Sequence, residues 1–214
     1  MKLSESYHDT LTELINIGYG RAAAALSELT GKRIVLEVPR VAVHPIDEVG
    51  VALGAVLTGE VASVHQVFSG PVSGNALLLL DQEAARVLHS LLVDEETSQG
   101  ALHAGAREAL TEVGNILLNA CLGVFGNLLQ VQVTFSVPRL HIESVDGVLH
   151  SISVRDQELK FALMVHTRFR LRESDVSGYL VIILGMTSFT RLLEEIERWE
   201  QRQLTTAERP AQGA

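Results

Sequence analysis

The chain has 214 residues, of which 47% are hydrophobic, and its formal net charge is −9. Such a composition supports a substantial core, while the absence of a Lys/Arg stripe argues against a nucleic-acid partner. The single cysteine, Cys121, excludes an intrachain disulfide, and the first ten residues lack the apolar core of a signal peptide. We therefore expect a cytoplasmic protein without membrane insertion.

The first half of the chain predicts six elements in the order α-β-α-β-β-α. Apolar residues three and four positions apart predict a first helix, which Ser4 or Ser6 caps and Gly31 ends. The β-branched run RIVLEV, residues 33–38, predicts a strand that Pro39 stops. The later predicted elements are a short helix near 46–53, strands over 55–68 and 72–80, and a closing helix over 82–92.

The second half repeats this order. The sequence around Glu13, LTELINIGYGRAAAALSELTGKRIVLEVPRV, aligns without a gap with LTEVGNILLNACLGVFGNLLQVQVTFSVPRL around Glu112, 99 residues later. The later predicted elements of this half are a strand over 131–137 that stops at Pro138, a short helix near 145–151, strands over 159–170 and 179–184, and a helix over 187–202.

The alignment predicts a single domain over 1–204 with two internal repeats, about 4–95 and 100–204, and a disordered tail over 205–214. Short turns that contain Gly or Asp and Ser favour antiparallel hairpins. The expected fold class is therefore α+β: a pseudo-two-fold duplicated α-β-α-β-β-α unit, with helices packed on one largely antiparallel sheet.

A polar stripe recurs at the same positions of both long helices. Its members are Asp9, Glu13 and Asn16 in the first helix and Glu108, Glu112 and Asn115 in the second. Spacings of i, i+4 and i+7 place each set on one helix face. An asparagine inside a helix costs about 0.6 kcal/mol relative to alanine, so we expect its carboxamide to have a function.

The residue types suggest how the stripe could act. A carboxamide donates and accepts hydrogen bonds, and it can hold a water near a phosphoryl group without repelling that anion. A carboxylate three residues away can instead bind a cation on a partner. The sequence shows no nucleophile with its base, no phosphate loop and no metal cage, so the substrate would supply the rest of the active site. For a single copy, a solvated helix face is an equal alternative, but the duplication favours the functional interpretation.

The two stripes continue to a proline at a fixed distance, and this pattern resembles the double signature of the CheC family of chemotaxis phosphatases. The motifs are Asp9-x3-Glu13-x2-Asn16-x22-Pro39 and Glu108-x3-Glu112-x2-Asn115-x22-Pro138. The resemblance extends over nearly the whole chain, from about Ser6 to Trp199. Glu108 departs from the family pattern, in which Asp or Ser is usual at the first position, and this puts the strength of the second site in doubt.

The resemblance implies hydrolysis of the aspartyl phosphate on a CheY-like response regulator. In the family, the asparagine, here Asn16 or Asn115, orients the attacking water, while the glutamate, here Glu13 or Glu112, pairs with a lysine of the receiver domain. The supporting residues would be Asp9, Glu108, Pro39 and Pro138. The Mg²⁺ would belong to the receiver, and the chain is expected to need no cofactor and to bind no metal.

Two other functions stay open. The same faces could recognise a receiver, or a CheD-like deamidase, without hydrolysis. A structural role in the flagellar motor, by analogy with FliY, is weakened because that protein has a separate C-terminal switch domain.

Several other residues in the long helices also allow predictions. Gly18, Gly20 and Gly114 predict close approach of another backbone or of the partner, because glycine is otherwise unfavourable in a helix. Cys121 lies on the apolar side of the second helix, so we expect a buried and chemically inert thiol.

Overall fold

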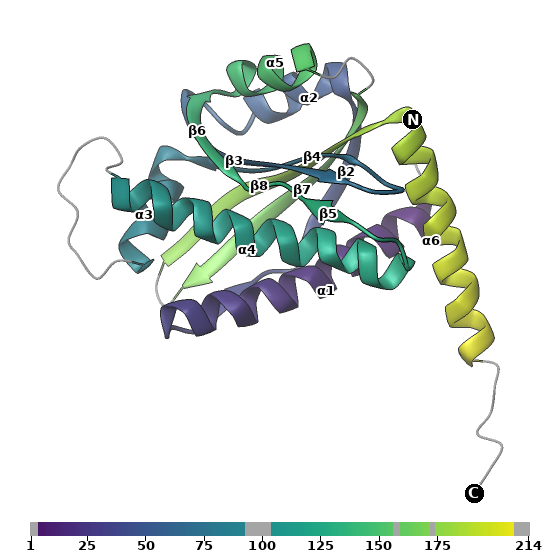
Figure 1. Cartoon of the computed structure of the whole chain (residues 1–214). Coiled ribbons are helices and arrows are strands. Elements are labelled where there is room, and N and C mark those ends of the chain that lie inside the picture. The colour runs from purple at the N-terminus through teal and green to yellow at the C-terminus, as the bar shows by residue number, and fades with distance from the viewer. Residues whose placement is uncertain (1–3, 93–103, 156–158, 172–173, 208–214) are drawn as a thin grey trace, which may run out of the picture.

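The computed structural model describes residues 4–92, 104–155, 159–171 and 174–207. Within these residues, all strand pairs are antiparallel, and they join into one eight-stranded sheet with helices on both faces (Figure 1). The elements are α1 (Glu5–Thr30), β1 (Ile34–Leu36), β2 (Arg40–Pro45), α2 (Ile46–Gly54), β3 (Glu60–Ser69), β4 (Gly74–Asp81), α3 (Gln82–Leu92), α4 (Ala104–Leu129), β5 (Thr134–Phe135), β6 (Arg139–Ser144), α5 (Val145–Arg155), β7 (Leu159–Leu171), β8 (Ser174–Gly185) and α6 (Met186–Ala207). The predicted α+β class is confirmed.

The ends of α1 follow from local chemistry, as the sequence predicts. The hydroxyl of Ser4 accepts a hydrogen bond from the backbone N–H of Tyr7 at 3.4 Å and caps the first turn. Gly31 follows the last turn with φ of 63°, a left-handed conformation that glycine adopts without steric cost.

The predicted order of elements is wrong in one respect, because each half contains a further strand. The chain re-enters the sheet directly after Pro39 as β2, and directly after Pro138 as β6. Proline lacks a backbone N–H, so it interrupts the ladder between β1 and β2 without removing the chain from the sheet. Each half is therefore α-β-β-α-β-β-α. At the other end of the chain, α6 continues to Ala207, three residues beyond 204; the rest of the predicted tail lies outside the described residues.

The sheet is built by exchange between the two halves. β2 of the first half pairs with β7 of the second, and β6 of the second pairs with β3 of the first. Their registers match: Arg40 is opposite His166, and Arg139, its counterpart 99 residues later, is opposite His65. Where the halves meet, β4 pairs with β8. This agreement in register supports the predicted internal repeat.

Two apolar cores lie on opposite faces of the sheet. The larger is shared with α1, α3, α4 and α6 and includes Leu14 and Leu117, while the smaller lies under α2 and α5 and includes Val49 and Val148 (Figure 1). Gly105–Asn127 in α4 is the one segment of the described residues that is long and apolar enough to cross a membrane. Half of its most apolar window is buried inside the protein, and the core helix of a soluble protein has the same length and composition.

The two long helices, α1 and α4, run side by side in opposite directions (Figure 1). They approach each other closely at Gly18, where an added Cβ would lie 2.8 Å from the Cα of Cys121. Gly114 faces the sheet instead, and a Cβ there would lie 2.5 Å from Val64 Cγ1. The prediction of close packing is thus confirmed for Gly18 as helix-to-helix contact. At Gly20 no other backbone approaches, because a Cβ would meet no described atom within 4 Å, and close approach of a partner there stays a prediction.

Candidate site: two acid–amide faces on α1 and α4

Each long helix carries one candidate site, site 1 on α1 and site 2 on α4. Site 1 comprises Asp9, Glu13 and Asn16, and site 2 comprises Glu108, Glu112 and Asn115. All four carboxylate side chains are exposed, and both carboxamides are half-buried. The neighbouring Leu14, Ile15 and Val113 are buried in the core. The acids and amides therefore line the border between the apolar stripe of each helix and solvent, where a partner can reach them.

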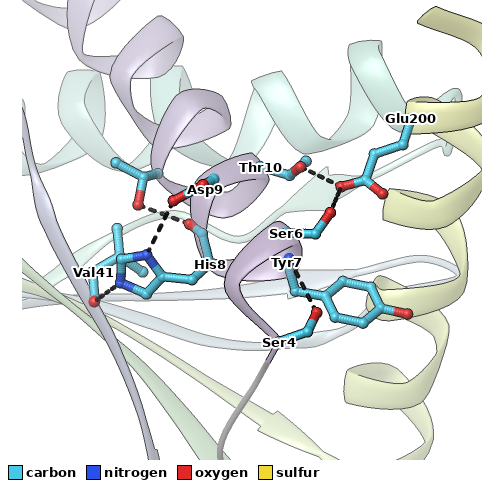
Figure 2. Close-up of polar contacts among 9 residues, drawn as sticks. Ser4, Ser6, Tyr7, His8, Asp9, Thr10, Val41 and Glu200 are labelled. Carbon is cyan, nitrogen blue, oxygen red and sulfur yellow. Dashed lines mark hydrogen bonds and ion pairs between the residues drawn. The ribbon is translucent and has the colours of Figure 1, made fainter. Parts of the chain in front are cut away.

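The first turns of α1 are attached to strand β2 beside site 1. His8 Nε2 lies 2.9 Å from the carbonyl oxygen of Val41, and its other ring nitrogen lies 3.7 Å from Asp9 Oδ1 (Figure 2). Thr12 Oγ1 donates to the carbonyl of His8 at 2.8 Å. A protonated imidazole would therefore pair with the first acid of the motif while remaining bonded to the strand.

The equivalent contacts recur at site 2 with different side chains. Arg107 occupies the position of His8, and its Nη2 donates to the carbonyl of Leu140 at 3.3 Å. Thr111 Oγ1 donates to the carbonyl of Arg107 at 2.7 Å, as Thr12 does at site 1. An open surface depression lies here, lined by Arg107, Glu108, Thr111, Glu112 and Leu140. Both acids of site 2 thus line one depression between α4 and β6, together with a basic residue.

Neither motif proline is exposed. Pro39 is buried and Pro138 is half-buried, so neither is presented freely to a partner. The residues before them are the opposite: the exposed fractions of Val38 and Val137 are 71% and 82%. A strongly exposed valine therefore precedes each motif proline, at a position that the motif does not include.

The two amides differ in their surroundings. Asn115 Oδ1 accepts a hydrogen bond at 2.7 Å from the amide nitrogen of Asn119, one helical turn further along α4. The residue at the corresponding position of α1 is Gly20. Within the described part of the chain, the Asn16 carboxamide makes no side-chain hydrogen bond.

Helix α6 fixes the start of α1 through carboxylates. Glu200 Oε1 accepts hydrogen bonds from Ser6 at 2.9 Å and from Thr10 at 2.5 Å (Figure 2). The phenol of Tyr7 donates to Glu197, and this hydrogen bond, with burial and the negative charge of Glu197, raises the pKa of Tyr7 to about 12. Residues about 190 positions apart thereby position the helix that carries site 1. No local sequence pattern indicates these contacts.

Two other kinds of chemistry, a reactive thiol and a metal site, can be checked in the structure. Cys121 is fully buried, and burial raises the pKa of its thiol far above the ordinary value. Its location confirms the prediction of a packing residue, because a protonated buried thiol is a poor nucleophile. Across residues 4–92, 104–155, 159–171 and 174–207, no group of three or more His, Cys, Asp or Glu side chains could hold a metal ion.

The fold is that of a CheC-like α+β protein. No protein-family model matches the chain. Among curated proteins, CheC1 of Halobacterium salinarum is 23% identical over 87% of this chain and 94% of its own length. The CheY-P phosphatase CheC of Bacillus subtilis is 24% identical over 89% of this chain and 93% of its own.

Solved structures show the same fold. The crystal structure of FliY from Thermotoga maritima matches with a TM-score of 0.76 and 20% identity, covering 93% of this chain and all of that chain. A chain of the CheX–CheY–BeF3–Mg²⁺ complex from Borrelia burgdorferi matches with a TM-score of 0.50 and 15% identity, over 81% of this chain and 99% of that one. The predicted resemblance to the CheC family of chemotaxis phosphatases is confirmed by these relatives.

Proposed function

We propose that this protein is a cytoplasmic phosphatase that hydrolyses the aspartyl phosphate of a CheY-like receiver domain. The observation that carries the proposal is the repeated geometry: an exposed glutamate and a half-buried asparagine, one helical turn apart, on each of two equivalent helices. The name of a full-length relative, CheY-P phosphatase CheC, supports this general activity. So does the similarity to the CheX–CheY complex, which supports a receiver as the partner.

The proposed roles follow from what each side chain can do. Asn16 or Asn115 holds a water in line with the phosphorus, and the half-buried amide has less freedom to leave that position than an exposed one. The water oxygen bonds to phosphorus as the bond to the aspartate oxygen breaks, which releases inorganic phosphate and a free aspartate. The receiver holds the Mg²⁺ that neutralises charge on the phosphoryl oxygens.

The glutamates are proposed to dock the receiver. Glu13 and Glu112 are exposed and can each pair with a lysine next to the phosphoaspartate. Asp9 and Glu108, one turn earlier, extend the negative face, and the buried Pro39 supports the helix from the strand side. The protein thus contributes orientation, which accounts for much of the catalysis in phosphoryl transfer.

The test is the decay of a phosphorylated CheY-like receiver with a catalytic amount of this protein. The double variant Asn16→Ala/Asn115→Ala should lower the rate of decay about a hundredfold, because the water is no longer positioned. Asn127→Ala is the matched control, since it removes an exposed amide from another face of α4. An unchanged rate in the double variant refutes the proposal. If the wild-type protein binds the phosphorylated receiver tightly without shortening its lifetime, the protein is a binding module instead.

A further inference from the structure

Asn119 forms a second amide on the face of α4 that carries site 2. It follows Asn115 by four residues, so the two side chains are neighbours on the helix surface. The amide nitrogen of Asn119 donates to Asn115 Oδ1 at 2.7 Å, a short and direct hydrogen bond. Asn119 is half-buried and lies outside the motif that identified the site.

This hydrogen bond restricts the rotation of the Asn115 carboxamide. The terminal torsion of an asparagine is broad and roughly two-fold, so an unrestrained carboxamide exchanges its oxygen and nitrogen positions readily. A donor fixed beside the oxygen selects one of these orientations. The Asn115 oxygen keeps a second lone pair and its nitrogen keeps both hydrogens, so the group can still bind a water. The bond therefore orients Asn115 and leaves it enough hydrogen-bond donors and acceptors to hold a water.

Stability does not account for the presence of Asn119. Its own Oδ1 is buried and has no hydrogen-bond partner within the described residues. A buried acceptor without a partner costs about 1–3 kcal/mol, and asparagine is less favourable than alanine inside a helix. With two unfavourable terms at this position, the hydrogen bond to Asn115 is the contact that can explain an asparagine here.

Helix α1 supplies a natural comparison, because it has the same amide without the second one. Gly20 stands where Asn119 stands on α4, and within the described residues no side chain hydrogen-bonds to Asn16. A Cβ added at Gly20 would meet nothing within 4 Å, so a larger side chain fits there. The chain thus contains one site with the second amide and one site without it.

We propose that Asn119 is a positioning residue of site 2, which orders the Asn115 carboxamide before the receiver binds. This inference rests on the proposed phosphatase function. At site 1, by contrast, the bound receiver must order the free Asn16 carboxamide itself. Preorganisation of this kind raises the rate of the chemical step and leaves receiver binding, which the glutamates provide, unchanged.

The first experiment isolates site 2 in an Asn16→Ala background and adds Asn119→Ala. Loss of one ordinary hydrogen bond corresponds to about 1 kcal/mol, so kcat for receiver dephosphorylation should fall about fivefold with an unchanged KM. Thermal stability should stay equal or rise, because the unpaired oxygen is removed. A fall in stability together with an unchanged kcat would show a purely structural role and overturn the proposal.

The second experiment introduces the second asparagine at site 1. In an Asn115→Ala background, Gly20→Asn should raise kcat about fivefold, while Gly20→Ala, which changes only helix propensity, should leave it unchanged. Equal kcat values for the two variants would overturn the proposal. Failure of the proposed function has a different signature: the double variant Asn16→Ala/Asn115→Ala would then dephosphorylate the receiver as fast as the wild type.

Discussion

The contact between the two site-bearing helices gives a quantitative prediction that two neighbouring glycines can test. Gly18 and Gly20 are both inside α1, so replacing either with alanine gains about 1 kcal/mol of helix propensity. Only the Cβ at position 18 meets other atoms: it would lie 2.8 Å from Cys121 Cα and 3.3 Å from the carbonyl oxygen of Ala120. These are backbone atoms, so α4 itself must move to make room.

Overpacking of this kind costs about 1–3 kcal/mol. Since the propensity gain is common to both variants, Gly18→Ala should be less stable than Gly20→Ala by about that amount, and Gly20→Ala should exceed the wild type. Urea unfolding measures both, provided that the m-values agree. Equal midpoints for the two variants would refute the close helix contact. Because site 1 and site 2 lie on the two helices that would be pushed apart, Gly18→Ala should also lower the phosphatase rate.

Three further predictions concern the surroundings of the sites. The pKa of Tyr7 is raised to about 12, so its hydrogen bond to Glu197 contributes stability below about pH 10 and loses it as the pH rises towards 12. In a spectroscopic tyrosinate titration, Tyr7→Phe should remove a component near pH 12, and removal of a component near pH 10 would contradict this. The buried thiol of Cys121 should react with a thiol reagent only as the protein unfolds, and rapid labelling of the native state would show that the site is open. Gly114→Ala should lower the free energy of unfolding by about 1–3 kcal/mol, since its Cβ would lie 2.5 Å from Val64 Cγ1. Adding Val64→Ala should make room for this Cβ, so the double variant should be more stable than the sum of the two single effects; additive effects in urea unfolding would argue against the contact.

The long helices and the central strands were predictable because their signals are local. Twenty-six residues of periodic apolar spacing define α1, and Ser4 and Gly31 mark its ends by their capping chemistry. β2 and β6 were missed, because six residues that begin after a proline have too short a pattern to separate from a loop. Their pairing with strands of the opposite half depends on how the two halves meet, which no local pattern encodes.

The candidate site also combines residues that the sequence reveals with residues that only the folded structure reveals. The acids and amides were found because the same spacing occurs twice, and repetition is visible without a structure. Asn119 was not found, since Gly20 replaces it in the first copy and the comparison of the two copies therefore passes over it. The contacts of Glu197 and Glu200 with the start of α1 join opposite ends of the chain, so only the folded structure reveals them.

The fixed interval between Asn16 and Pro39 has a geometric explanation. The chain leaves the end of α1, turns back and runs along the helix: the backbone N–H of Ile34 donates to Ser27 Oγ at 3.0 Å, and the carbonyl of Val41 lies 2.9 Å from His8 Nε2. A strand advances about 3.3 Å per residue and a helix about 1.5 Å. Counted from the contact at His8, Pro39 is at the height of the turn between Thr12 and Glu13, and counted from Ser27 it is at the height of Asn16. The interval therefore places Pro39 at about the height of the acid–amide pair along α1, and a change in its length would shift the strand relative to site 1.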